Sequence, residues 1–220
     1  MQEPTAGANN SRLVILLIAG IPVIMVLAAT WLWWFVARGE LDIVGMLGTA
    51  NRGTLLDPPR PLAEAGLLSP TGTPLPWSNV DHQWTLLVTQ EGAECATACE
   101  HKLYLTRQIH LALGKEFPRV RRMLITDRAP ADTALGVSDL SDNKPAPADF
   151  AGLLAEEHGG LVVARLDGAS WPQLFPETRA KDDLWYLVDP AGWVMMTYDA
   201  SDSYKDVISD LKFLLKNSGD

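Results

Sequence analysis

The stretch that decides the fold is residues 84–103, WTLLVTQEGAECATACEHKL, which begins at Trp84 and ends at Leu103. Its apolar run over residues 86–88 predicts a short strand buried on both faces. A polar loop follows, and Cys95 and Cys99 stand where a helix is expected to begin. The backbone amides at a helix start carry partial positive charge, which lowers the pKa of a thiol. The pair is therefore a candidate reactive dithiol or soft metal site.

Composition narrows the function classes. The chain has 220 residues and a formal net charge of -9, and this acidic balance argues against a nucleic-acid partner. Cys95 and Cys99 are the only cysteines, so one disulfide is possible and a disulfide framework is excluded. A single close pair favours redox or metal chemistry. The alternative is that both cysteines are buried and act as small apolar residues.

An uncharged apolar run covers residues 13–37 and is bounded by Arg12 and Arg38. A helix of this length crosses a hydrocarbon core of about 30 Å with some tilt. Interfacial tryptophans are expected near its end, where the sequence has Trp31, Trp33 and Trp34. A cleaved signal peptide is the alternative, although the bulky residues there leave no small-residue cleavage site. We predict a tail at 1–12, a transmembrane anchor at 13–37, a lead-in at 38–80 and a folded domain at 81–220.

The lead-in is rich in proline and glycine but also carries several leucines, so we expect it to pack on the edge of the domain. A turn is predicted at Pro70-Thr71-Gly72, between two short strands. The basic residues on both sides of the anchor do not set its orientation. The short N-terminal tail and long C-terminal domain fit an N-inside anchor that exports the domain.

Signals for strands and helices alternate through the rest of the chain. Helices are predicted over 96–115, 149–158 and 203–216, and strands over 86–88, 120–126, 161–166, 185–188 and 193–198. The last two strands join at the turn Asp189-Pro190-Ala191-Gly192. This order implies a partly parallel sheet covered on both faces. A strand that delivers two cysteines to the first helix, with a β-β-α ending, predicts an α/β thioredoxin-like fold with a central mixed sheet, preceded by one transmembrane helix.

Three further motifs carry a family resemblance. They are Cys95-x-x-x-Cys99, the strand end Leu124-Ile125-Thr126-Asp127, and Tyr186-Leu187-Val188-Asp189-Pro190-x-Gly192. Together with the anchor they resemble the Sco/SenC family over about residues 50–215. The lead-in motif Asn51-Arg52-Gly53-Thr54-Leu55-Leu56, with Pro58-Pro59, is similar to a Sco-related branch associated with cytochrome oxidase.

The resemblance implies a thioredoxin-like domain tethered to the inner membrane by a single pass, with the domain in the periplasm. It also implies a role in assembling the dinuclear copper centre of cytochrome c oxidase. The partners would be oxidase subunits or their assembly factors. The implied cargo is copper(I), held by Cys95 and Cys99.

The sequence departs from the family pattern at the site. The family's third copper ligand is a histidine five residues before the tyrosine of its Tyr-Leu-x-Asp-Pro strand, and here that position is Lys181, followed by Asp182 and Asp183. A protonated lysine cannot ligate copper. The family's prolines beside the cysteines are replaced by Ala96 and Glu100.

Two chemistries remain open for the pair. As a redox couple, Cys95 lies nearer the loop and is predicted to be the exposed attacking thiol, with Cys99 resolving. The helix start must loosen for the two to join, because residues four apart in a helix lie slightly too far apart. Glu94 and Glu100 are expected to oppose thiolate formation, and Lys181 to favour it. As a metal site, two thiolates suit linear Cu(I) coordination.

Other polar clusters have simpler interpretations. His82, His101, His110 and His158 are expected at the surface or at caps. One of Met195 and Met196 is expected in the core. We interpret Arg119, Arg121 and Arg122 as a solvated edge, or as a docking patch for an acidic partner.

Three functions remain. The first is a Sco-like oxidase assembly factor handling copper(I) or target thiols. The second is a membrane-tethered thiol–disulfide oxidoreductase without metal. The third is a non-catalytic, oxidase-associated binding module.

Overall fold

The computed structural model describes residues 7–37, 51–77 and 83–218, and in the first range it describes side chains only for 14–34. The chain divides into two compact units, Met1–Ala50 and Asn51–Asp220. The predicted boundary at residue 81 falls within the second unit, so much of the predicted lead-in belongs to that unit.

The described part of the first unit, residues 7–37, is the helix α1 (Gly7–Ala37), with Pro22 inside it. Its segment Val14–Trp34 has a mean hydropathy of 2.5 and is long and apolar enough to cross a membrane. The predicted apolar helix near the N-terminus is confirmed.

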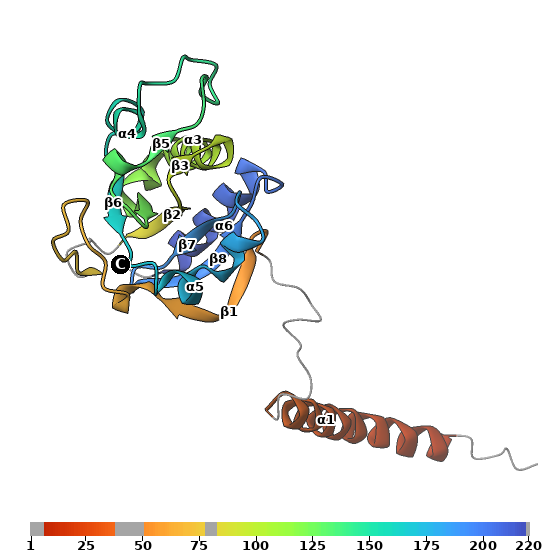
Figure 1. The fold of residues 1–220 in the computed structure, drawn as a ribbon. Coiled ribbons are helices and arrows are strands. Elements are labelled where there is room, and N and C mark those ends of the chain that lie inside the picture. The colour runs from red at the N-terminus through yellow and green to blue at the C-terminus, as the bar shows by residue number, and fades with distance from the viewer. Residues whose placement is uncertain (1–6, 38–50, 78–82, 219–220) are drawn as a thin grey trace, which may run out of the picture. The chain divides into compact units, whose positions relative to one another are not determined.

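The second unit is built on a six-stranded mixed sheet in the order β1-β8-β7-β2-β4-β6 (Figure 1). The strands are β1 (Thr54–Pro61), β2 (Trp84–Gln90), β4 (Val120–Thr126), β6 (Val162–Arg165), β7 (Trp185–Val188) and β8 (Trp193–Tyr198). The pairs β2·β4 and β4·β6 are parallel, whereas β2·β7, β7·β8 and β1·β8 are antiparallel. A separate two-stranded sheet joins β3 (Glu94–Cys95) to β5 (Ala134–Leu135).

Helices cover both faces of the main sheet. The α-helices are α3 (Thr97–Ala112), α4 (Phe150–Glu157), α5 (Trp171–Leu174) and α6 (Tyr204–Asn217), and the 3-10 helices are η1 (Leu62–Glu64), η3 (Gly114–Arg119), η4 (Pro130–Asp132) and η5 (Pro176–Arg179). One core cluster joins α3, α4 and α6 to side chains such as Leu86 and Val88. The other joins η1 and α5 to Leu87 and Met123 on the opposite face. The predicted thioredoxin-like layering is confirmed.

Side-chain caps mark where two of the three predicted helices begin, and a glycine follows the end of the third. The Asp149 side chain accepts a hydrogen bond from the Gly152 amide, and Ser203 accepts one from the Asp206 amide, as N-cap residues do. The helix predicted over 96–115 ends earlier, at Ala112. Gly114 has a φ of +60° and begins a 3-10 helix that contains Pro118, so the α-helix does not continue.

The proline-rich strand β1 forms one edge of the sheet. It pairs with β8 at both of its ends, Thr54 with Thr197 and Pro61 with Trp193, and its register shifts in between. The start of β1 is held by Asp210 on α6. Asp210 is 4% exposed. Its carboxylate accepts hydrogen bonds from the backbone amides of Arg52 at 2.9 Å and Gly53 at 3.1 Å. Leu68 pairs with Pro74 across the predicted Pro70-Thr71-Gly72 turn.

Candidate thiol–disulfide site

Cys95 and Cys99 are joined by a disulfide, with an S–S distance of 2.00 Å and a Cα–Cα distance of 5.2 Å. Cys95 ends the short strand β3, and Cys99 lies in the first turn of α3. Ala96 between them is extended, with φ -83° and ψ -170°. The first cysteine therefore stands outside the helix, which gives the loosened helix start that the pairing requires.

Both cysteines belong to the core cluster on the α3 face of the sheet. Cys95 is 0% exposed and Cys99 is 4% exposed. Cys99 borders a half-open cavity of about 360 Å³, whereas Cys95 is not among the cavity-lining residues. The prediction that Cys95 is the exposed thiol is therefore wrong. Cys95 pairs with Leu135 of β5, and Cys99 is the cysteine that lines the cavity.

Three segments form the cavity beside Cys99. They are the end of β2 with the following loop, the start of α3, and the region from α5 to the loop before β7. The lining residues other than Cys99 are Thr89, Gln90, Glu91, Glu94, Ala96, Ala98, Lys102, Trp171, Thr178 and Asp182. The carboxyl ends of β2 and β4 meet at this edge of the sheet, where open α/β sheets commonly place their ligands.

Lys102 is the functional candidate that sequence reasoning missed. It is 5% exposed, and its ammonium donates hydrogen bonds to the carbonyl oxygens of Thr89 at 3.1 Å and Asp182 at 2.6 Å. Burial lowers the pKa of Lys102 to about 8, although the charges of Asp182 and Asp183 oppose this shift. A sequence signal existed, because a lysine three residues after Cys99 falls on the buried face of α3.

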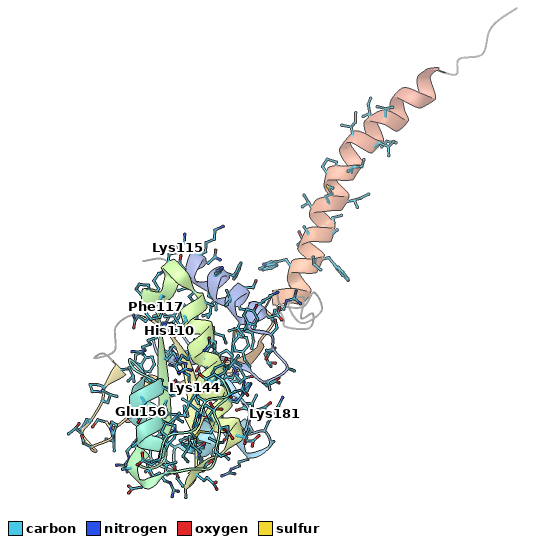
Figure 2. The ribbon with its side chains drawn as sticks, turned by 90° about the horizontal axis from the view of Figure 1, so that it is seen from above. His110, Lys115, Phe117, Lys144, Glu156 and Lys181 are labelled. Carbon is cyan, nitrogen blue, oxygen red and sulfur yellow. A yellow bond between two sulfur atoms is a disulfide. The ribbon has the colours of Figure 1, made fainter. Side chains whose placement is uncertain are left out.

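Lys181 does not take the place that the family comparison implied for it. Its ammonium lies 2.5 Å from Asp199 and 3.9 Å from Asp183, and the hydrogen bond to Asp199 raises the pKa of Lys181. Lys181 does not line the cavity, and Figure 2 shows its side chain at the side of the domain. The expectation that it acts on the cysteines is wrong. The loop itself does reach the cavity, through Asp182.

The two glutamates that flank the cysteines have different surroundings. Glu94 is exposed and lines the cavity. Glu100 is 3% exposed and accepts hydrogen bonds from the amide of Ser141 at 3.0 Å and from its hydroxyl at 2.5 Å. Glu100 therefore anchors the loop around Ser141 and does not line the cavity.

The described histidines do not line the cavity beside Cys99. His101 contacts the Ser141 hydroxyl at 3.2 Å, and His110 stacks on Phe117 with ring centroids 3.9 Å apart (Figure 2). His158 is 3% exposed and receives a hydrogen bond from Arg122, and its pKa falls to about 3 because of burial and the neighbouring arginines. His82 lies outside the described residues.

The arginine cluster of β4 is internal. Arg121 is 7% exposed and Arg122 is 4% exposed, so the expectation of a solvated edge or a docking patch is wrong for both. The guanidinium of Arg121 donates to the Thr85 hydroxyl at 2.8 Å and stacks over the Trp77 ring at 4.5 Å. In β8, Met196 is buried and Met195 is half-buried, as predicted.

The donor set limits what metal the site can hold. Among the described residues, no group of three or more histidine, cysteine, aspartate or glutamate side chains is placed to bind a metal ion. The two sulfurs could act as ligands only after the disulfide is reduced, and the ammonium of Lys102 borders the same cavity. The residues present therefore do not fit a three-ligand copper site, and only a two-thiolate Cu(I) site is compatible with them.

Comparison with known proteins agrees with this architecture. The model of the family described as "Transmembrane-like, thioredoxin-like, C-terminal domain" matches residues 84–218. No curated protein matches the chain. The crystal structure of yeast Sco1 is similar at 14% identity with a TM-score of 0.50, covering 70% of this chain and 93% of that chain.

Two further structures are similar. Copper-bound ScoI of Bradyrhizobium japonicum has 20% identity and a TM-score of 0.44, covering 67% of this chain and 94% of that chain. The thioredoxin domain of a thiol-disulfide oxidoreductase from Bacteroides vulgatus has 10% identity and a TM-score of 0.43, covering 70% of this chain and 97% of that chain.

Proposed function

The chain belongs to the transmembrane-like, thioredoxin-like C-terminal domain family, and from this premise we propose that it is a membrane-anchored thiol–disulfide exchange protein. Its substrate is a disulfide in a partner protein, and the partner is a subunit or assembly factor of a respiratory cytochrome c oxidase. One observation carries the proposal. Cys95 and Cys99 form a disulfide, and one of the two residues, Cys99, lines a half-open cavity.

The exchange uses the reduced pair. The Cys99 thiolate attacks one sulfur of the target disulfide and forms a mixed disulfide, while the other target sulfur leaves and takes up a proton. Cys95 then loses its proton and attacks the Cys99 sulfur, which restores the Cys95–Cys99 disulfide and releases the second target thiol. Two electrons pass from the pair to the target. A protein dithiol on the same side of the membrane must reduce the pair for the next cycle.

We place the domain in the periplasm, with α1 spanning the inner membrane and the N-terminus inside. Two observations support this placement. The apolar segment Val14–Trp34 is the candidate span, and a disulfide persists most readily in an oxidising compartment.

A second candidate function is delivery of copper(I) to the oxidase. The short distance between the two cysteines favours it, because two thiolates four residues apart can hold Cu(I) without a histidine. The copper would be cargo bound by reduced Cys95 and Cys99.

Trapping experiments with the full chain in detergent micelles test the exchange. Reduced Cys95→Ser protein should accumulate a mixed disulfide with a model peptide disulfide, because the attacking thiol remains and the resolving thiol is gone. Cys99→Ser protein should not. If the reduced wild type leaves the peptide disulfide intact and neither variant traps it, the exchange function is wrong.

Metal titration distinguishes delivery of copper(I) from thiol–disulfide exchange without metal. Reduced wild type and Cys95→Ser protein are equilibrated with Cu(I) against a competing chelator. One Cu(I) held per wild-type chain, and none by the variant, would favour delivery of copper. Equal and weak retention by both proteins would exclude it.

A further inference from the structure

We propose that Lys102 is a positioning residue that directs thiol exchange onto Cys99, by holding a positive charge and an N–H donor beside the Cys99 sulfur. The inference rests on the proposed exchange function and deepens it. It assigns a role to a buried lysine that the family resemblance does not involve.

Helix geometry places the two side chains together. Cys99 and Lys102 are three residues apart on α3, so they lie on the same face of the helix, and both line the cavity. An ammonium has three N–H groups. The carbonyl oxygens of Thr89 and Asp182 accept two of them, and these two bonds fix the ammonium between the end of β2 and the loop before β7.

The surroundings make this charge effective. Lys102 is 5% exposed, and its ammonium donates hydrogen bonds to two backbone carbonyls, with the charges of Asp182 and Asp183 nearby. A charge buried in this way is screened much less than a surface charge. A thiolate at Cys99 gains from a neighbouring cation, and Cys99 lines the same cavity as Lys102, whereas Cys95 does not. The charge therefore favours Cys99 as the attacking sulfur, and later as the leaving sulfur.

Burying a lysine opposes folding, which argues against a purely structural role. A methionine of similar length would fill the same space without desolvating a charge. The lowered pKa of Lys102, about 8, reflects this desolvation, yet the side chain remains mostly protonated at pH 7. The bonds to the Thr89 and Asp182 carbonyls use two of the three N–H groups, and we assign the third N–H group and the charge to the Cys99 sulfur.

The test measures the reactivity of Cys99 directly. The full chain in detergent micelles carries Cys95→Ala, so that Cys99 is the only thiol, and is alkylated at pH 7 with the uncharged reagent iodoacetamide. Lys102→Met is expected to slow alkylation about tenfold, and Lys102→Arg to stay within threefold of the parent. Lys181→Met is the matched control, and we expect no change, because Lys181 is paired with Asp199.

Defined outcomes would overturn the inference. One is an alkylation rate of Lys102→Met protein within twofold of that of its parent, when its near-ultraviolet circular dichroism spectrum is unchanged. The other is Lys102→Arg protein that reacts as slowly as Lys102→Met. If Lys102→Met does not fold, Lys102→Gln replaces it, since the amide keeps N–H donors and removes the charge.

A measurement on the unsubstituted lysine covers the case in which neither variant folds. In wild-type protein labelled with ¹³C-lysine, the ε-methylene resonance of Lys102 should move when the disulfide is reduced, and a static resonance would refute the contact. The exchange function is judged separately. Alkylation that depends on Lys102 in a protein unable to reduce a peptide disulfide would uphold the inference and reject the function.

Discussion

Reduction of the Cys95–Cys99 disulfide is expected to weaken the domain only slightly. The bond closes a loop of five residues, because the two cysteines are four apart in sequence. The chain-entropy relation for a five-residue loop gives about 7 cal/mol/K, which is about 2 kcal/mol at 25 °C. Typical domains are stable by about 5–15 kcal/mol, so the reduced form should remain folded. The pair could then cycle between its two states within one fold, as an exchange function requires.

The assay is urea unfolding of the full chain in detergent micelles, with and without a phosphine reductant, followed by near-ultraviolet circular dichroism. The midpoint should fall while the slope of the transition stays unchanged. Cys95→Ala with Cys99→Ala is the control, since it should not respond to the reductant. Loss of a cooperative transition on reduction, or a loss above about 5 kcal/mol, would mark the disulfide as a structural staple and refute the reasoning.

Three further predictions concern the rest of the domain. His158 has a pKa of about 3 in the folded state and 6.5 in the unfolded state. Its contribution to the free energy of unfolding is complete above pH 6.5, and about 3 kcal/mol of it is lost as the pH is lowered to 4. His158→Asn should flatten that part of a pH-dependent urea titration, and an unchanged profile would contradict the assignment. Asp210→Asn should cost about 2–4 kcal/mol, because the amide cannot accept both backbone N–H groups and the Tyr198 hydroxyl. Hydrogen exchange should then show faster opening of β1, and protection equal to wild type would exclude that role. Gly192→Ala should lower the melting temperature with a cost of about 1–3 kcal/mol, since Gly192 has a φ of +92° and the added methyl would lie 2.6 Å from Ala63. A melting temperature equal to that of the wild type would show that the turn relaxes freely.

The alternation of strands and helices was predictable because each element carries its own periodic signal. β4 and the β7–β8 hairpin appear at the predicted bounds, since a short apolar run between turn residues has few other solutions. Strand β1 carried no such signal. Its prolines oppose strand formation in isolation, and it is held by pairing with β8, by the carboxylate of Asp210 and by the bonds of Arg60 to Leu174 and Glu177. Such long-range partners cannot be inferred from one local window.

The candidate site was predictable in its position but not in its details. The helix start and the pair of cysteines are local features, and the structure joins them as a disulfide. The burial of Cys95 depends on a two-residue pairing with β5, for which the sequence carries no pattern. Lys102 was not singled out from the sequence, because its ammonium is held by carbonyl oxygens from β2 and from the loop before β7. The spacing from Cys99 could have shown that Lys102 lies on the buried face of α3, but the two acceptors are distant in sequence and could not be predicted from it.

The sequence of strand β1 affects how readily copies of this chain associate through the edge of the sheet. A protein confined to a membrane plane meets its own copies far more often than one free in solution, and an open sheet margin invites strands from neighbouring chains. Here the outermost strand reads TLLDPPRP, and its three prolines have no N–H group with which to recruit another backbone. The proline-rich segment thus makes this margin of the sheet a poor template for self-association while the chain stays tethered.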